Sequence, residues 1–411
     1  MQMSYPKQII YNINYLKVLK DFFINTETSE FLNNFKNIAN IEDKEVLLLG
    51  RARAGIFLAV KNSIKSKKNN LVFLSSYTIP EVIDLVIHAG GKPYFIDFNK
   101  DTTYFHIPSL QSNMKLNPAA IIITHYNLNQ ISYKKISEIV KQNNSILIED
   151  SALSISGKSK NININTLSDY SIYSFSSFKL LNFFYGGAIV YNKKFKKEIN
   201  NETKNWQKLN LKDYLPQLVR TIIFDFITSK YLFSNLTIKY LKHKYINKNQ
   251  SDFIEKKLKI EKTFIDKNYF SHPAKLMAKE LNRKLNQYES NKSHRIKISK
   301  IYYKHLKSVS INGDTDLLEN IEKSDNFNYL IKCQNEKHRD ILKKKLLVNN
   351  YDVGKTFYEN CHLLERFSKF EGVSKNITDL SSKILILPTH YLISENYAES
   401  LSHAIIKNYW N

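Results

Sequence analysis

SILIED, residues 145–150, is a short apolar run that ends on two carboxylates, and similar runs recur between residues 45 and 195. The others are EVLLLG (45–50), NLVFLSS (70–76), KPYFIDF (92–98), AAIIITH (119–125), SIYSFS (171–176) and GAIVYN (187–192). Helix-compatible stretches or brief polar loops separate them. Apolar runs of about four to six residues joined by helical segments are typical of parallel strands buried on both faces. The sequence therefore predicts an α/β fold with a mostly parallel central sheet flanked by helices.

The length of the chain predicts two domains. The chain has 411 residues, and single hydrophobic cores stop growing at about 250–300 residues. We expect a large domain over 1–262, which includes a lysine-rich helical segment at 196–262. A smaller C-terminal α/β domain over 263–411 would hold a long helix around 273–307, the strand-like segments FNYLIKC and ILILPTHYL, and a final helix from about 394 to 409.

The net charge of +23 raises the question of an anionic partner. A composition rich in Lys, Asn, Ile and Tyr spreads lysine over the whole surface, and no nucleic-acid recognition module is present, so we expect no nucleic acid partner. The aromatic and basic segment 218–245 is either a solvated helical face or a contact with an anionic membrane surface. Both interpretations stay open from the sequence.

Cysteine usage and hydropathy favour a cytoplasmic protein. Cys333 and Cys361 stand far apart in the sequence, so we expect neither a disulfide framework nor a metal site. The first residues lack the apolar core of a signal peptide. The most apolar stretch, 218–233, is interrupted by charged residues, which argues against a membrane span.

Two charged residues at strand ends suggest a cofactor site. Asp150 ends SILIED and is either a helix N-cap or the anionic partner of a protonated pyridine nitrogen, as pyridoxal phosphate requires. Lys179 lies in YSFSSFKLLNFFYGGAIV, residues 173–190, an apolar setting for a lysine. It either extends its amine to water or is a desolvated amine able to form a Schiff base. Together the two residues favour the cofactor site.

A phosphate site is predicted beside them. GRARAG (50–55) follows the first strand and opens a helix, where backbone N–H groups, including that of Ala54, bind phosphate. Arg53 would add a charge-assisted hydrogen bond, and the hydroxyl of Ser174 a further donor. The alternative is a turn whose arginines face solvent.

The order of these motifs resembles the DegT/StrS family of pyridoxal-phosphate-dependent sugar aminotransferases. GRARAGIFLAV is similar to the family's Ser-Gly-Thr-Ala-Ala-Leu helix start, and IEDSALSISG to Glu-Asp-x-Ala-Gln-x-x-Gly. The stretch that contains Lys179 is similar to Phe-Ser-x-x-x-x-Lys followed by Asp-Gly-Gly-Ala. TFYENCHLL resembles Tyr-x-x-x-His, and ILILPTHYL resembles Leu-Pro-x-His-x-x-Leu. The resemblance covers about 45–195 and 270–409.

The resemblance implies the fold type I aminotransferase architecture with pyridoxal 5'-phosphate on Lys179, Asp150 at its ring nitrogen, and Ser174 and Arg53 at its phosphate. It places Tyr358 and His362 near the substrate. It also implies a homodimer that transfers an amino group from glutamate to a nucleotide-activated keto-sugar, for surface polysaccharide or glycoconjugate synthesis.

Four departures from the family pattern leave other functions open. The ring-stacking aromatic falls on Ile79, unless Tyr77 turns inward to supply the ring. Leu153, Tyr185 and Phe270 stand where the family has glutamine, aspartate and arginine. One alternative is therefore a catalytically degenerate homologue that acts as a scaffold or regulatory subunit. Another is a pyridoxal-phosphate-dependent sugar dehydratase, although family dehydratases carry histidine at the position of Lys179.

Overall fold

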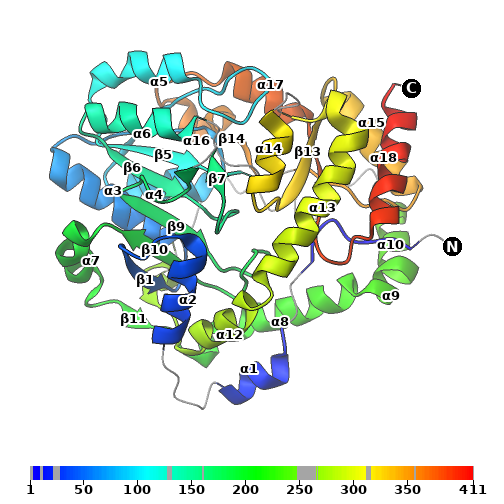
Figure 1. The fold of residues 1–411 in the computed structure, drawn as a ribbon, viewed down its shortest axis with the longest axis horizontal. Helices are drawn as coiled ribbons and strands as arrows, with labels where there is room; N and C mark the ends of the chain where they lie inside the picture. Colours follow the sequence, from blue (N-terminus) through cyan, green and yellow to red (C-terminus); the bar gives the residue numbers. More distant parts are fainter. Residues whose placement is uncertain are drawn as a thin grey trace.

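The computed structural model describes most of the chain. The described residues are 3–9, 13–21, 28–126, 132–159, 162–247, 265, 267–311, 316–355 and 358–410. Figure 1 shows a central sheet with helices on both sides and a second group of helices around a two-stranded sheet near the C-terminus.

The central sheet has seven strands in the order β1-β10-β9-β6-β5-β2-β4. Their bounds are β1 Glu45–Leu49, β2 Leu71–Leu74, β4 Lys92–Phe95, β5 Ala120–Thr124, β6 Ile146–Asp150, β9 Tyr170–Ser174 and β10 Gly187–Tyr191. The strands from β9 to β4 pair in parallel, whereas β10 runs antiparallel to both β9 and β1. The predicted mostly parallel α/β sheet is confirmed, and its carboxyl-terminal edge is where ligands bind in such folds.

Side chains alternate between the two faces of the sheet, so each face has its own helical cover. On β5, Ile122 belongs to the apolar core formed with α3 and α4, while Ile121 and Ile123 belong to the core formed with α5 and α6. The helices of the first core are α3 Arg53–Lys67, α4 Pro80–His88 and α7 Lys196–Thr203. Those of the opposite face include α5 Ile107–Asn113, α6 Tyr133–Gln142 and, toward β10, α2 Ser29–Ala39.

The C-terminal part of the chain builds a separate apolar core. Its strands, β13 Asn328–Lys332 and β15 Ile384–Pro388, pair antiparallel. Its helices are α13 Tyr288–Leu306, α14 Asp316–Lys323, α15 Glu336–Val348 and α18 Glu395–Tyr409, with α17 Lys375–Lys383 on the side of the central sheet. The final predicted helix is therefore present. The long helix predicted around 273–307 is instead two helices, α12 Leu276–Leu285 and α13, because the backbone breaks between them at Asn286 and Gln287.

The N-terminal segment packs against the C-terminal core. Tyr5 is buried in that core, and the backbone N–H of Lys7 donates to Asp352 Oδ2 at 2.9 Å. His390 Nε2 lies 2.7 Å from the carbonyl oxygen of Pro6. These contacts fix Gln8 between the two halves of the molecule.

Residues 211–247 form a helical arm that extends along the lower side of the molecule in Figure 1. It consists of α8 Leu211–Thr228, α9 Lys230–Leu232, a π-helical turn Phe233–Thr237, α10 Ile238–Lys242 and a second π-helical turn His243–Asn247. The rest of the predicted lysine-rich helical segment, 248–262, lies outside the described residues. Among the helices that the structure describes, none is both long and apolar enough to cross a membrane.

The first residue of β10 lies against the start of α3, and this contact requires glycine. A Cβ atom on Gly187 would lie 2.4 Å from Ala52 Cα and 2.6 Å from Ala52 N. Because both are backbone atoms, relief of the clash would move α3 or β10.

We therefore expect Gly187→Ala to lower the free energy of unfolding by about 1–3 kcal/mol, measured by urea denaturation. Gly354→Ala is the control, because the nearest atom to its new Cβ, at 2.7 Å, is Cδ of the flexible Lys7 side chain. Equal losses in the two variants would contradict the assignment of a rigid contact at Gly187.

Candidate active site

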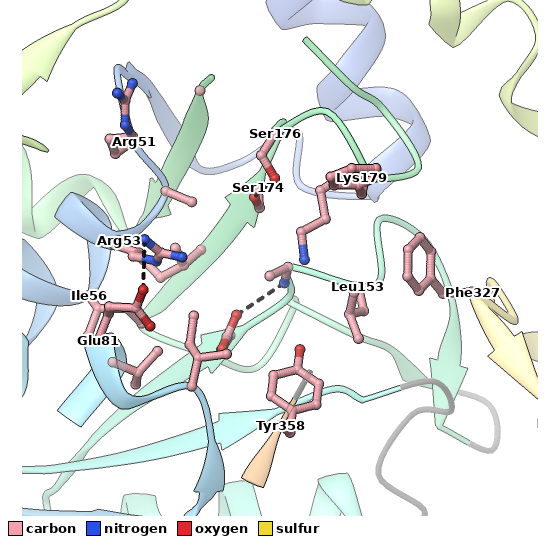
Figure 2. Close-up of a pocket in the computed structure, with 18 of the residues that line it drawn as sticks. Arg51, Arg53, Ile56, Glu81, Leu153, Ser174, Ser176, Lys179, Phe327 and Tyr358 are labelled. Atoms are coloured by element: carbon pink, nitrogen blue, oxygen red, sulfur yellow. Dashed lines mark hydrogen bonds and ion pairs between the residues drawn. The ribbon is translucent and has the colours of Figure 1, made fainter. Parts of the chain in front are cut away.

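A pocket of about 350 Å³ opens at the carboxyl-terminal edge of the sheet, between the sheet and the C-terminal part of the chain. Residues from both parts line it: Gln8, Arg51, Ala52, Arg53, Ile56, Ile79, Glu81, Val82, Asp150, Ala152, Leu153, Ile172, Ser174, Ser176, Phe178, Lys179, Tyr185, Gly186, Phe327, Asn328, Tyr358 and Ile386. In Figure 2 the amine of Lys179 and the hydroxyl of Tyr358 point into the pocket from opposite sides. The volume suits a small-molecule site.

Lys179 and Asp150 line this pocket together. Desolvation lowers the pKa of Lys179 to about 8, with a further contribution from the Arg53 guanidinium, while the Asp150 carboxylate opposes the change. Desolvation also raises the pKa of Asp150, against the effect of the hydrogen bond from Ala152 N, 3.1 Å from Oδ1, and of the nearby positive charges. The described residues place no ion-pair partner on Asp150. The pocket therefore holds an amine that loses its proton easily and a buried carboxylate able to accept a cationic partner.

Arg53 is engaged by protein groups rather than directed freely at the pocket. Its Nη1 donates to the Tyr269 hydroxyl at 2.9 Å and lies 3.5 Å from Glu81 Oε1. Desolvation alone would lower the pKa of Arg53, but Glu81 and Tyr269 raise it. The guanidinium is thus a fixed positive charge at the wall of the pocket.

Ser174 and Ser176 provide hydroxyls on the same side of the pocket as the start of α3. Their Oγ atoms lie 3.4 Å apart, and both residues appear above the centre of the pocket in Figure 2. The first turn of α3 contains no acidic residue. The N–H groups of Ala54 and Gly55 donate to the carbonyls of Arg51 and Ala52, at 3.2 and 2.8 Å. The two serine hydroxyls and the positive end of the α3 dipole therefore suit an anion.

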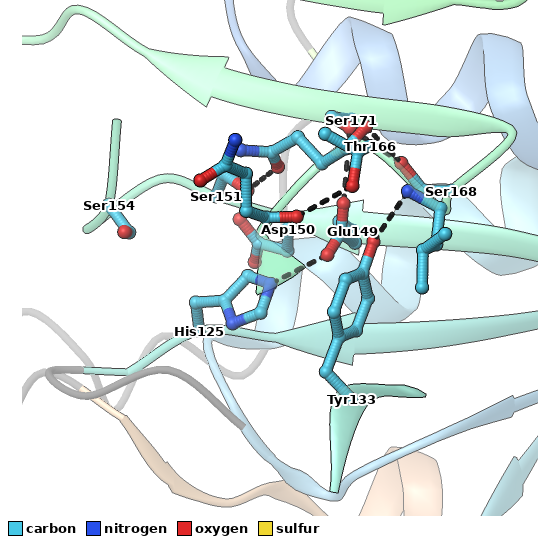
Figure 3. Close-up of polar contacts among 12 residues, drawn as sticks. His125, Tyr133, Glu149, Asp150, Ser151, Ser154, Thr166, Ser168 and Ser171 are labelled. Carbon is cyan, nitrogen blue, oxygen red and sulfur yellow. Dashed lines mark hydrogen bonds and ion pairs between the residues drawn. The ribbon is translucent and has the colours of Figure 1, made fainter. Parts of the chain in front are cut away.

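A buried polar layer lies behind Asp150 (Figure 3). His125 Nε2 and Glu149 Oε1 are 2.9 Å apart, and the Ser171 hydroxyl donates to Glu149 Oε2 at 3.3 Å. Burial alone would raise the pKa of Glu149, but the hydrogen bond and charge of His125, together with Lys44, lower it. This carboxylate is therefore held charged within the sheet. Because Glu149 and Asp150 are adjacent on β6, the layer fixes the strand end that carries Asp150.

The helical arm supports the loop that carries Lys179. Gln217 Nε2 donates to Ser177 Oγ at 3.1 Å, and the Thr221 hydroxyl lies 3.1 Å from the same atom. The rings of Phe224 and Phe178 meet edge to face at 4.7 Å. Ser177 and Phe178 directly precede Lys179, so one face of α8 positions the amine.

Of the four residues that depart from the family pattern, Ile79, Leu153 and Tyr185 line the pocket and Phe270 does not. The Arg51 guanidinium lies 3.3 Å from the centre of the Tyr185 ring, an attractive cation–π contact. Leu153 and Ile79 both line the pocket. Phe270 instead packs against Phe57, with ring centres 4.7 Å apart, and against His88 and Trp206.

Three predicted site residues do not line the pocket. Tyr77 does not turn inward; it is buried among Phe98, Tyr126 and Tyr358, and its carbonyl accepts from the Tyr126 hydroxyl at 2.6 Å. His362 bonds to Ser374 Oγ and to the carbonyl of Phe370, at 3.0 and 3.1 Å. Ala54 is buried inside α3. Hydrogen bonds and core packing, which the motif alone does not reveal, account for these positions.

Other pocket residues were not predicted from the sequence. Gln8 comes from the N-terminal segment, Glu81 from the first turn of α4, and Phe327 and Asn328 from the C-terminal part. None belongs to a recognisable motif, and only tertiary contacts bring them to the pocket. Among the described residues, no group of three or more His, Cys, Asp and Glu side chains is arranged to hold a metal ion.

Solved structures share this architecture over the whole chain. Helicobacter pylori PseC, described as an aminotransferase involved in the biosynthesis of pseudaminic acid, has a TM-score of 0.74 at 12% identity and covers 100% of both chains. The Escherichia coli GDP-4-keto-6-deoxy-D-mannose-3-dehydratase, solved with hydrated pyridoxal phosphate, has a TM-score of 0.71 at 14% identity, over 98% of this chain and 100% of that one. The chain thus has the fold of pyridoxal-phosphate-dependent aminotransferases.

A match to a protein-family model identifies the family of this chain. The DegT/DnrJ/EryC1/StrS aminotransferase family model matches residues 18–208 and 274–406. This chain belongs to that family.

Similarity to curated relatives is more limited. The UDP-4-amino-4,6-dideoxy-N-acetyl-beta-L-altrosamine transaminase of Campylobacter jejuni is 26% identical over 189 residues, 43% of this chain and 47% of the relative. The GDP-perosamine synthase of Escherichia coli O157:H7 is 25% identical over 30% of this chain and 34% of the relative. The chain spans less than half the length of these relatives.

The low pKa of Lys179 can be tested by its reactivity. We expect modification by an amine-reactive reagent, followed by peptide mass spectrometry, to show a pH midpoint of about 8 for Lys179. Exposed lysines in the same digest should show pH midpoints of about 10.4. Asp150→Asn should move the midpoint of Lys179 lower, because it removes the charge that favours the ammonium, and Arg53→Gln should move it higher. A Lys179 midpoint equal to that of the exposed lysines would refute the desolvation argument.

Proposed function

We propose that this protein is a pyridoxal-phosphate-dependent aminotransferase that transfers an amino group from an amino acid, glutamate, to a keto group of a nucleotide-activated sugar. The observation that carries the proposal is the pairing of Lys179, with its lowered pKa, and the buried carboxylate of Asp150 in one pocket at the carboxyl-terminal edge of the sheet.

The residues of the pocket fit the cofactor. Asp150 has no protein cation as an ion-pair partner among the described residues, and would hold the ring nitrogen of the cofactor in its protonated form. Ser174, Ser176 and the positive end of the α3 dipole would hold the phosphate, with Arg53 adding positive charge behind them. When bound, pyridoxal phosphate supplies an electron-withdrawing ring that stabilises a carbanion.

Lys179 would have two roles in the reaction. Its amine, unprotonated in a useful fraction near neutral pH, would hold the cofactor through the carbonyl carbon, with loss of the carbonyl oxygen as water. As a free amine, Lys179 would take the proton from the donor's α-carbon as a general base. The loop held by α8 keeps this nitrogen above the pocket in both roles.

The walls of the pocket suit a dianionic substrate. Arg51 and Arg53 lie at the wall, and Tyr358, Phe327 and Asn328 line the same pocket. A nucleotide-activated sugar carries a diphosphate that these charges would attract. The printed activities of the relatives from Campylobacter and Escherichia coli concern nucleotide-linked sugars, which supports this substrate class.

A dehydratase is the alternative that keeps both fold and cofactor, because one structural neighbour is a dehydratase. Lys179 favours transamination, since a primary amine can both hold the cofactor and move the proton. A degenerate scaffold would not be expected to retain a lysine of lowered pKa beside a buried carboxylate.

The oligomeric state, location and domain boundaries of the enzyme are also proposed. We propose a homodimer in the cytoplasm that serves surface polysaccharide or glycoconjugate synthesis. We also propose a large domain over 1–262 and a small domain over 263–411. The separate apolar core that α13, α15, α18, β13 and β15 form supports a distinct C-terminal domain. Tyr5 joins that core from the N-terminal segment, and α12 packs with the central sheet.

Reconstitution with pyridoxal phosphate tests the proposed cofactor. We expect the wild-type protein to acquire a visible absorption band that changes when glutamate is added, and Lys179→Ala to lack it because no amine can attach the cofactor. Lys292→Ala is a matched control, since Lys292 is a partly buried lysine near Asp325, outside the pocket lining. A wild-type protein that never takes up the cofactor would overturn the proposal.

Gln8 gives a test of the substrate side. It is 6% exposed and lines the pocket, and neither atom of its side-chain amide has a hydrogen-bond partner among the described residues. An unsatisfied buried amide costs about 1–3 kcal/mol, so we expect a substrate to supply the missing partners. Gln8→Leu should leave the melting temperature unchanged or higher while raising KM for the nucleotide-sugar about tenfold.

Asn62→Leu is the control for that experiment. Asn62 is also a buried amide, but it lies outside the pocket lining, so its replacement should leave KM unchanged. An unchanged KM in Gln8→Leu would contradict the substrate contact.

A further inference from the structure

The helical arm, residues 211–247, exposes an unusual amount of apolar surface. Nine of the twenty large hydrophobic side chains exposed in the described part of the chain lie on it: Leu215, Val219, Ile222, Ile223, Phe226, Ile227, Tyr231, Leu236 and Tyr240. Phe226 is 66% exposed and Tyr231 is 73% exposed. On α8 these residues recur every three or four positions, so they share one helical face. A contiguous apolar face of this kind marks an interaction surface.

The arm packs against the rest of the protein through its other face. The opposite face of α8 buries Tyr214, Leu218 and Thr221, and further along the arm Phe233 and Ile238 pack with Leu347 of α15. The arm is therefore anchored along its length by one face. The second apolar face is presented outward.

The charge of the arm indicates which partner this face would bind. The arm contains five lysines and one arginine but only two aspartates. Its second half, residues 230–247, holds four of the lysines and no acidic residue. Exposed aliphatic and aromatic residues on one face together with adjacent lysines are the pattern of helices that lie on anionic lipid.

The arm also lies outside the part of the chain that the family model matches, which ends at residue 208 and resumes at residue 274. The family model therefore does not account for the apolar surface of this segment. The described helices include none that could cross a bilayer. At 18 residues, α8 would extend about 27 Å along a surface.

We propose that the helical arm docks this protein peripherally on an anionic lipid surface. The apolar face of α8 lies in the interface between headgroups and acyl chains, and Lys230, Lys239 and Lys244 lie against the lipid phosphates. The fourth lysine, Lys242, instead donates to the carbonyl of Val348 at 2.7 Å. A second copy of the chain fits the face less well. Each copy carries a net charge of +23, so like-charge repulsion opposes an interface between two copies, whereas an anionic surface attracts the arm.

Vesicle flotation tests the docking, with vesicles of phosphatidylcholine alone or mixed in equal parts with phosphatidylglycerol. Wild-type protein should float with the anionic vesicles, remain unbound with the neutral ones, and be released as salt rises. The double variant Ile223→Ser/Phe226→Ser should lose flotation. Lys230→Gln/Lys239→Gln should weaken binding by about fivefold for each lysine removed.

The matched control is Ile87→Ser/Leu116→Ser, which removes an exposed isoleucine of α4 and an exposed leucine that follows α5, both outside the arm. It should float like the wild type. Circular dichroism melting establishes that each variant is folded; if the double variant of α8 is not, Lys230→Gln/Lys239→Gln decides alone.

Three results would overturn the proposal. The first is no flotation of the wild type with anionic vesicles. The second is equal flotation of wild type and both arm variants. The third is conversion of the wild-type oligomer to monomer by Ile223→Ser/Phe226→Ser in sedimentation without lipid, which would make the face a contact between copies. None of these readouts depends on enzyme activity, so failure here is distinct from failure of the proposed function.

Discussion

The free energy of placing an amine and a carboxylate together in one poorly solvated pocket is the constraint on which the site depends. Desolvation acts on both groups in the direction of the neutral form: it lowers the pKa of Lys179 and raises that of Asp150. Their mutual attraction opposes this. The positive charge of Arg53 adds to the effect of desolvation on Lys179, and Glu81 keeps that charge in place. The balance leaves an amine that is reactive at moderate pH beside an acid that benefits from a cationic ligand.

The surrounding structure can be understood as support for these two groups. Asp150 ends β6, whose preceding residue, Glu149, is held by His125 and Ser171. Lys179 lies on a loop braced from outside by Gln217 and Phe224 of α8. One group is fixed by the sheet and the other by a helix. The arm is therefore structurally connected to the amine even though its outer face points away from the pocket.

The sequence predicted well those features that depend on local pattern. Apolar runs identified all seven strands of the central sheet, because buried parallel strands are apolar on both faces. The sequence also indicated a common site for Lys179, Asp150 and Ser174, because the ends of parallel strands meet at one edge of a sheet; all three residues line the pocket. The sequence does not show how long-range packing places individual side chains. Tyr77 and His362 have suitable chemistry, but neighbouring rings and hydrogen bonds hold them away from the pocket.

Gln8 illustrates the opposite failure. Nothing near it in the sequence suggests a site, and it reaches the pocket only because Tyr5 and Lys7 are bound to the C-terminal part of the chain. Likewise, the pattern at 273–307 is helical throughout, and the break between α12 and α13 separates a helix that packs on the central sheet from one in the C-terminal core. In both cases the structure depends on tertiary contacts that the local sequence does not reveal.

The departures from the family pattern make the pocket wall less polar. Leu153 and Tyr185 line the pocket where the family pattern has groups that carry hydrogen bonds or charge, and the Arg51 guanidinium lies over the Tyr185 ring. Phe270 packs against Phe57 and does not line the pocket. A less polar wall solvates charge less well, so it strengthens the effect of each remaining charge on the others. The shift in the pKa of Lys179 is a desolvation effect. These replacements therefore act in the same direction as the change that makes the lysine reactive, and they are consistent with a site that has been altered rather than lost.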